Sequence, residues 1–102
     1  MSETTQVSRM EVGRRIAEIR GRMDELDATL VNLLNERATC ARDIGYLKGK
    51  VGLAVYQPDR EVEVLENVQS RNRGPLEDRA VVRLFKEIIN EAKQLEESHS
   101  EG

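Results

Sequence analysis

Two basic residues stand in a stretch whose other regularly spaced residues are apolar. Arg37 and Lys48 are eleven residues apart, which on an α-helix is about 20° around the axis and roughly 16 Å along it. Two long cations on one stripe could converge on a small anion between them. An internal salt bridge, or a polar pair that fixes the register of a coiled coil, explains the same pattern and is the more common outcome.

Glu96 is a second charge at a position where the pattern calls for an apolar residue. It follows Ile89 by seven residues and Phe85 by eleven, so it continues an apolar helical stripe. One interpretation is a frayed last turn in solvent. The other is a carboxyl group held in a site, where only its protonated form can donate a hydrogen bond.

Three further charges are candidates for a binding site. Arg60 and Glu61 come two and three residues after Pro58 and either open a helix in solvent or line a pocket at the mouth of the preceding linker. Arg20 lies about 25 Å from Arg37 along the helix and roughly 100° around it. The two can grip one small molecule only if Arg20 comes from an antiparallel partner chain, and alone Arg20 is an ordinary surface arginine.

Other kinds of chemistry lack suitable residues. The only histidine is His99, near the end of the chain, so a histidine metal site or a catalytic triad is not expected. The only cysteine, Cys40, falls on the apolar stripe and is interpreted as a small buried apolar residue rather than a nucleophile. No glycine-rich phosphate loop is present in the sequence. The residues that remain for chemistry are cations and carboxylates.

The cations lie on a long predicted helix. No proline interrupts residues 9–50, and apolar residues recur in steps of three and four. The stripe consists of Ile16, Ile19, Met23, Leu26, Leu30 and Leu33, and the same steps continue through Arg37, Cys40, Ile44, Leu47 and Val51. A helix of 42 residues is about 63 Å long, whereas a compact domain of this size has a radius of gyration of about 13 Å. We therefore expect this helix to pack along the same helix of a second chain.

Two shorter helices are predicted over residues 58–70 and 77–97, joined by an extended linker before Pro58 and a turn at Asn72–Pro75. Their apolar sides are expected to be Val62, Leu65, Val68 and Gln69 in the first, and Val81, Leu84, Phe85, Ile88, Ile89, Ala92 and Leu95 in the second. The expected organisation is one helical domain over residues 9–97, with disordered segments at 1–8 and 98–102.

Composition supports an all-α fold and excludes several classes of protein. Of 102 residues, 34% are charged and 3% are aromatic, which disfavours a β-sandwich or barrel. The 38% hydrophobic share would fill the core of a lone monomer thinly. A net charge of −3 without a basic stripe argues against a nucleic-acid partner, and no apolar run approaches a membrane span. A single cysteine and no apolar leader predict a soluble cytosolic protein.

The ordered set of these residues resembles the all-helical, AroQ-class chorismate mutases over about residues 14–97. The strings that carry the resemblance are Ile19-Arg20, Leu26-Asp27, Leu33-Leu34-Asn35-Glu36-Arg37, Ile44-Gly45-Tyr46-Leu47-Lys48, Tyr56-Gln57-Pro58-Asp59-Arg60-Glu61 and Leu84-Phe85-Lys86-Glu87-Ile88-Ile89. The family's fold is an intertwined homodimer of three-helix chains, one helix being very long. Its members convert chorismate to prephenate by a Claisen rearrangement without a cofactor or metal.

The resemblance implies a role for each cation of the long helix. Arg37 would hold one carboxylate of the substrate. Arg20, reaching across from the partner chain, would hold the other. Lys48 would contact a carboxylate and the ether oxygen of the breaking bond. A buried Arg37 would then have the substrate as its counter-ion.

The resemblance also implies roles beyond that helix. Glu61 would accept a hydrogen bond from the ring hydroxyl, and Arg60 would add positive field near the substrate. Glu96 stands where the family places a Gln or Glu that hydrogen-bonds the ether oxygen. Ala92 replaces a serine that some members carry near the substrate. Gln57 replaces an acidic residue and would contribute its backbone rather than its side chain.

Two alternatives remain open at this stage. An isochorismate-pyruvate lyase shares the scaffold and the substrate type, although the lysine and the linker fit a mutase better. A helical dimerisation module without catalysis would tolerate leucine in place of Arg37, Lys48 and Glu96. Loss of chorismate in a spectrophotometric assay separates these three functions.

Overall fold

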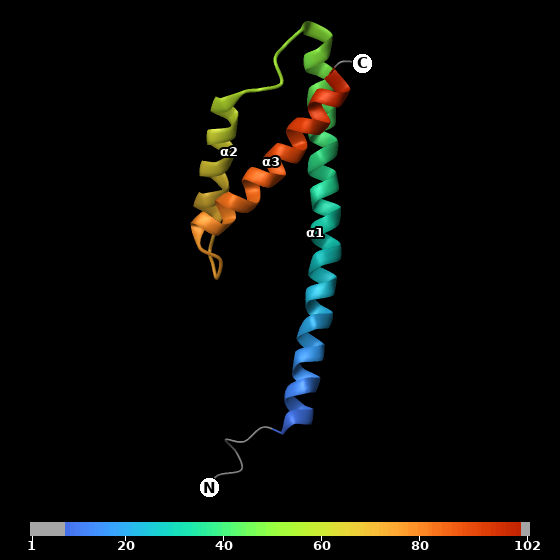
Figure 1. Ribbon diagram of the computed structural model, residues 1–102, viewed down its shortest axis with the longest axis vertical. Coiled ribbons are helices and arrows are strands. Elements are labelled where there is room, and N and C mark those ends of the chain that lie inside the picture. The colour runs from blue at the N-terminus through green and yellow to red at the C-terminus, as the bar shows by residue number, and fades with distance from the viewer. Residues whose placement is uncertain (1–7, 101–102) are drawn as a thin grey trace. The chain divides into compact units, whose positions relative to one another are not determined.

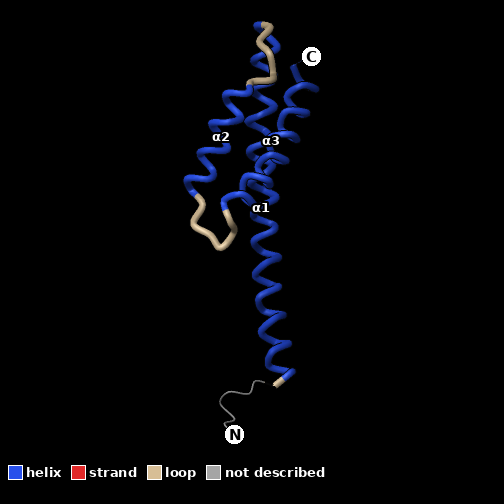
Figure 2. Tube along the Cα trace, turned by 60° about the vertical axis from the view of Figure 1, so that its left-hand side comes forward, coloured by secondary structure: helices blue, strands red, loops and turns tan. Residues whose placement is uncertain are grey.

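The computed structural model describes residues 8–100, with the side chains described as far as Ser98. These described residues form three α-helices, α1 (Arg9–Val51), α2 (Pro58–Arg71) and α3 (Asp78–Ser100) (Figure 1). Figure 2 shows that only loops join them within this described part. The prediction of an all-α chain with one very long helix is confirmed.

The predicted helix boundaries are close to those observed, with differences at the two ends. Ser8, expected to be disordered, caps α1, and residues 98–100, also expected to be disordered, continue α3. Residues 1–7 and 101–102 of the expected disordered segments lie outside the described residues. The chain divides into two compact units, residues 1–33 and 34–102, which are described separately.

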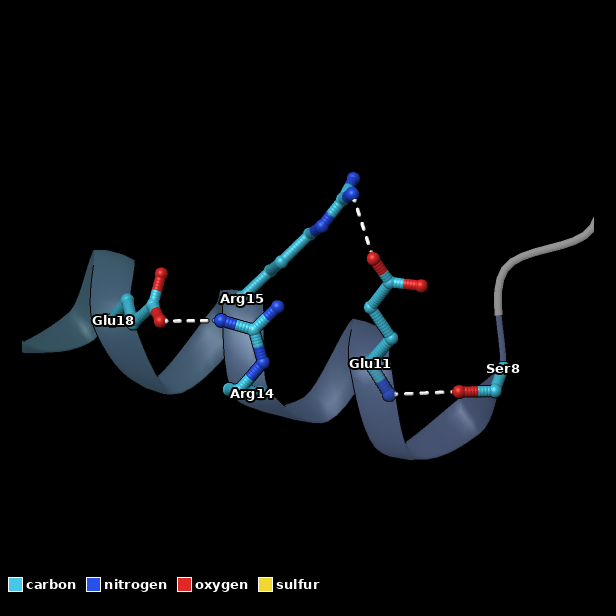
Figure 3. Close-up of polar contacts among 5 residues, drawn as sticks. All are labelled: Ser8, Glu11, Arg14, Arg15 and Glu18. Atoms are coloured by element: carbon cyan, nitrogen blue, oxygen red, sulfur yellow. Dashed lines mark hydrogen bonds and ion pairs between the residues drawn. The ribbon is translucent and has the colours of Figure 1, made fainter. Parts of the chain in front are cut away.

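In the N-terminal unit, α1 begins with a capped turn and exposed ion pairs (Figure 3). The backbone N–H of Glu11 donates to Ser8 Oγ at 3.0 Å, which satisfies one of the free donors at the helix start. Arg15 pairs with Glu11 at 2.9 Å and Arg14 with Glu18 at 2.8 Å, each one turn apart. These pairs favour the helix locally but are too exposed to contribute much stability.

The apolar stripe of this unit lies open. Its exposed fractions range from 42% at Ile16 to 61% at Ile19, with Met23, Leu26, Leu30 and Leu33 between these values. An isolated helix gains little stability from its own hydrogen bonds and depends on packing of its apolar face. A continuous stripe of this kind is typical of a surface that another helix covers.

In the C-terminal unit, α1 has a buried face beside the stripe that we expect a second chain to cover. The expected stripe residues Ile44 and Leu47 are 46% and 60% exposed. Instead Ala41 is buried, at 6% exposure, and so is Gly45. This face lies one residue on from the stripe, and its small side chains let another helix of the same chain approach α1 closely.

That approach brings α3 against α1 at one point. A Cβ added to Gly45 would lie 2.7 Å from the carbonyl oxygen of Glu96 and 2.8 Å from its Cα. Real Cβ atoms essentially never come this close to other atoms, so only glycine fits here. In Figure 1 the C-terminal end of α3, in red, lies along the green end of α1.

Helix α2 packs on α3 through a side that overlaps the predicted one, since Leu65 and Val68 are half-buried and Gln69 is exposed. Val64 is buried, at 9% exposure, whereas Val62 is 56% exposed. Leu84 of α3, expected on the apolar side, is 57% exposed. Between α1 and α2, Gly52 adopts φ +72° where α1 ends, a conformation that favours glycine.

Across the part of the chain that the structure describes, no helix combines the length and apolar character that a bilayer crossing requires.

Candidate anion-binding site

A pocket with a volume of about 290 Å³ lies in the C-terminal unit. It is lined by residues of all three helices and of the linker between α1 and α2. These residues are Arg37, Cys40, Ala41, Ile44, Lys48, Val55, Gln57, Arg60, Glu61, Val64, Ile89, Ala92, Lys93 and Glu96. The fold thus brings together every site residue predicted from the sequence except Arg20.

Lys48 and Glu96 form an ion pair in this pocket. Lys48 Nζ lies 3.3 Å from Glu96 Oε2 and also donates to the carbonyl oxygen of Val55 at 3.4 Å. The two side chains are only 13% and 16% exposed, so water screens their attraction weakly. The Glu96 side chain is therefore held in the pocket rather than part of a frayed terminal turn.

Arg37 lines the same pocket but is not paired as Lys48 is. Arg37 is half-buried, and within residues 8–98 the structure gives it no carboxylate partner. A partly dehydrated guanidinium without an anion is costly, and it offers up to five N–H donors to a ligand. Of the two interpretations of the Arg37 and Lys48 pattern, an internal ion pair thus applies to Lys48, while Arg37 keeps its donors for an anion.

Glu61 is paired with a residue that the sequence analysis did not single out. Lys93 Nζ lies 2.7 Å from Glu61 Oε1 and 4.6 Å from the centre of the Tyr56 ring. The hydrogen bond to Glu61 raises the pKa of the Lys93 ammonium above its ordinary value of 10.5, so Lys93 is charged at neutral pH. Lys93 comes four residues after Ile89 and three before Glu96, and this spacing on the apolar stripe is the signal that could have identified it.

The remaining predicted residues of α2 and the linker are at the pocket as well. Gln57 precedes α2 and makes no side-chain cap, but its carbonyl accepts hydrogen bonds from the N–H groups of Arg60 and Glu61, at 3.1 and 3.3 Å. The Arg60 side chain is exposed and pairs with Glu63 one turn on. It therefore adds positive charge at the rim without being buried.

The sequence analysis also singled out Ala92, Cys40 and Arg20. Ala92 lines the pocket and adds no polar group. Cys40, expected to be buried, is exposed and lines the pocket, because Ala41 rather than Cys40 faces the packed helix. Arg20 lies on α1 in the N-terminal unit and is exposed, and its role across a partner chain stays a prediction.

The charges of the pocket favour a small dianion. Four cations, from Arg37, Lys48, Arg60 and Lys93, meet the two carboxylates of Glu61 and Glu96. The groups that line the pocket thus carry an excess of two positive charges, one of them from Arg60 at the rim, which also pairs with Glu63, and this excess favours a ligand with two carboxylates. A second, larger hollow of about 420 Å³ shares Arg37 and Ala92 but otherwise carries no cation, so we assign anion binding to the first.

Fixed cations of this kind can assist an intramolecular reaction of a bound dianion. They hold the ligand in one conformer, which removes part of the entropic barrier. Donors already aimed at an oxygen that gains negative charge stabilise the transition state without reorganising. Neither effect needs a nucleophile or a general base.

Comparison with known proteins places these features in a family. The family model described as chorismate mutase type II matches residues 19–97. Over 77 residues the chain is 49% identical to a bifunctional chorismate mutase/prephenate dehydratase of Neisseria gonorrhoeae, a match covering 76% of this chain and 21% of that protein. The chain thus spans about a fifth of the length of this relative.

Two further relatives are of similar size to this chain. A chorismate mutase of Methanocaldococcus jannaschii is 26% identical over 88 residues, covering 85% of this chain and 89% of that protein. The solved structure of a chorismate mutase from Thermus thermophilus (form II) superposes with a TM-score of 0.80 at 37% identity, covering 81% of this chain and 94% of that one.

Proposed function

Because the chain belongs to the chorismate mutase type II family, we propose that it converts chorismate to prephenate in the pocket of its C-terminal unit. The observation that carries this proposal is the half-buried Arg37 without an ion-pair partner among residues 8–98, beside the Lys48–Glu96 pair. Chorismate has two carboxylates, and its Claisen rearrangement is intramolecular. The reaction therefore needs the cations that line this pocket and no covalent step.

Each charged residue has a role in this proposal. Arg37 binds one carboxylate, and Lys48 binds a carboxylate and the ether oxygen of the bond that breaks. Glu96, 3.3 Å from Lys48, donates to the same oxygen in its protonated form. Glu61 accepts a hydrogen bond from the ring hydroxyl, and Arg60 adds positive field. During the rearrangement, negative charge grows on the ether oxygen, so the donors from Lys48 and Glu96 stabilise the transition state more than the ground state.

We propose further that two chains form a homodimer and that Arg20 completes the partner's site. The exposed stripe from Ile16 to Leu33 supports this proposal, because a helix with this spacing pairs with another helix of the same kind. A second copy supplies such a stripe in equal length. Arg20 would then bind the second carboxylate of a substrate held by Arg37 of the other chain.

The alternatives make different predictions for the same assay. A mutase consumes chorismate and forms prephenate, an isochorismate-pyruvate lyase forms salicylate and pyruvate from isochorismate, and a dimerisation module does neither. Purified protein is incubated with each substrate, and the products are separated by chromatography. We expect prephenate from chorismate. Salicylate from isochorismate without prephenate, or no product at all, would contradict the proposal.

The expected cytosolic location stays a prediction.

A further inference from the structure

Lys93 lines the pocket, yet neither the spacing of the sequence nor the family resemblance gave it a role. It joins three segments that are separate in the chain. From α3 its ammonium reaches Glu61, in the first turn of α2, at 2.7 Å, and lies 4.6 Å from the ring of Tyr56 in the linker. These two contacts hold one wall of the pocket together.

The contact with Glu61 is partly sheltered from water. The side chains of Lys93 and Glu61 are 29% and 30% exposed. A short hydrogen bond between two charged groups is among the stronger polar contacts in proteins, and partial burial reduces its screening. The aromatic face of Tyr56 adds a second attraction for the ammonium. Two side chains that line the pocket, Lys93 and Glu61, are thereby restricted in position before any ligand arrives, and Tyr56 of the linker is joined to them.

From this geometry we infer that Lys93 is a positioning residue for substrate binding. It fixes the Glu61 carboxylate in its acceptor form at the wall of the pocket where the ring hydroxyl binds. It also supplies one of the pocket's four cations, without which the excess of positive charge falls from two to one. The inference rests on the proposed function, since that function assigns the hydroxyl to Glu61.

This role predicts an effect on binding more than on the chemical step. The ring hydroxyl and the net charge of the substrate are the same in the ground state and the transition state. Loss of an interaction made equally in both states raises KM and leaves kcat nearly unchanged. A variant that is only less well folded has fewer active molecules, which lowers the apparent kcat and leaves KM unchanged.

The kinetic test uses three variants of the full chain. Lys93→Met removes the charge and keeps the length of the side chain, and Lys93→Arg restores a charge. The matched control is Lys86→Met, which removes the same charge from an exposed position of α3 two turns away that lines neither hollow. We expect Lys93→Met to raise the KM for chorismate about tenfold, the scale for losing one charged hydrogen bond. Lys93→Arg should recover most of this loss, and Lys86→Met should match the wild type.

A double-mutant cycle tests whether Lys93 acts through Glu61. If it does, Lys93→Met should raise KM less in a Glu61→Gln background than in the wild type, because the partner is already lost. Equal effects in both backgrounds would overturn the positioning role. So would a Lys93→Met variant with the same KM as Lys86→Met, or one that lowers kcat alone.

A measurement without turnover separates this inference from the proposed function. The NMR signal of the Lys93 ε-carbon is followed through an alkaline titration in the wild type and in Glu61→Gln. The midpoint should be lower in Glu61→Gln, because the hydrogen bond that raises the pKa of Lys93 is lost. An unchanged midpoint would show that the pair is absent and overturn the inference alone. A lowered midpoint in a protein that never converts chorismate would overturn the proposed function and, with it, the substrate role of Lys93.

Discussion

Lys48 Nζ and Glu96 Oε2 lie 3.3 Å apart, although the two residues are 48 positions apart in the chain. They meet because α3 touches α1 at Gly45, three residues before Lys48, where a Cβ would collide with the backbone of Glu96. The absence of a side chain at Gly45 thus sets the distance between the two groups that we place at the ether oxygen. Packing and chemistry depend on the same contact.

The first prediction concerns Gly45→Ala. The added Cβ would lie 2.7 Å from the Glu96 carbonyl oxygen, so the backbones must separate. Overpacking of this kind costs about 1–3 kcal/mol. We expect a lower unfolding midpoint in denaturant and a fall in kcat, since Lys48 and Glu96 move apart.

The chain offers a matched control for this substitution. Gly13 is also in the interior of α1, and a Cβ added there meets nothing within 4 Å. Gly13→Ala should raise stability by roughly 0.5–1 kcal/mol through better helix propensity and leave kcat unchanged. If Gly45→Ala behaved like Gly13→Ala, the close contact would be wrong.

The second prediction concerns the protonation of Glu96. Glutamine has nearly the shape of glutamic acid and donates from its amide at any pH. Glu96→Gln should therefore keep substantial activity. Glu96→Ala removes the donor and should lower kcat by about a hundredfold at every pH. Rates of chorismate loss from pH 5 to 8 check both variants, and wild-type rates in Glu96→Ala would exclude Glu96 from the site.

Cys40 gives a third prediction, which tests the pocket without a mutation in it. It is the only cysteine of the sequence, and it is exposed and lines the pocket. Saturating prephenate should slow its alkylation by iodoacetamide, measured as the mass increase with time. A Cys40→Ser protein should take up no label under the same conditions. An alkylation rate that prephenate does not change would place the ligand elsewhere.

Helix α1 shows which features of the fold can be predicted from the sequence. Its length and its end near Gly52 were predicted correctly, because the helical period and the absence of proline are local properties. The buried face at Ala41 and Gly45, one residue on from the stripe of Cys40 and Ile44, was not predicted. A stripe of large apolar side chains does not indicate a contact made by small ones. Two helices approach closely where their facing residues are alanine or glycine.

The candidate site shows the same division between local and tertiary information. Spacing and family resemblance selected Arg37, Lys48, Glu61 and Glu96, and the fold gathers them around one pocket. The pairing of Glu61 with Lys93 was not predicted, because it joins α2 to α3 across the packed unit. A lysine on a helix next to an apolar stripe is usually a solvated residue. Only the tertiary arrangement reveals its partner.

The fourth prediction tests the shared site of the proposed homodimer. Arg20→Ala and Arg37→Ala chains should each be inactive alone, because every site lacks one arginine. After unfolding and joint refolding, a mixed dimer contains one site with both arginines intact. With random pairing the mixture should recover about a quarter of the wild-type activity. If the mixture stays as inactive as its components, Arg20 and Arg37 do not serve one site from two chains; an active Arg20→Ala protein would show that Arg20 has no role.

The initial rate of chorismate loss in Lys48→Ala, compared with the wild type, tests the central claim most directly. The control is Arg42→Ala, which removes an exposed cation of the same helix that lines neither hollow. At equal concentrations of folded protein, we expect Lys48→Ala to be slower by about a hundredfold or more, the scale for losing one preorganised donor. Arg42→Ala should match the wild type. A Lys48→Ala rate equal to that of Arg42→Ala would contradict the assignment of this pocket as the site of the rearrangement.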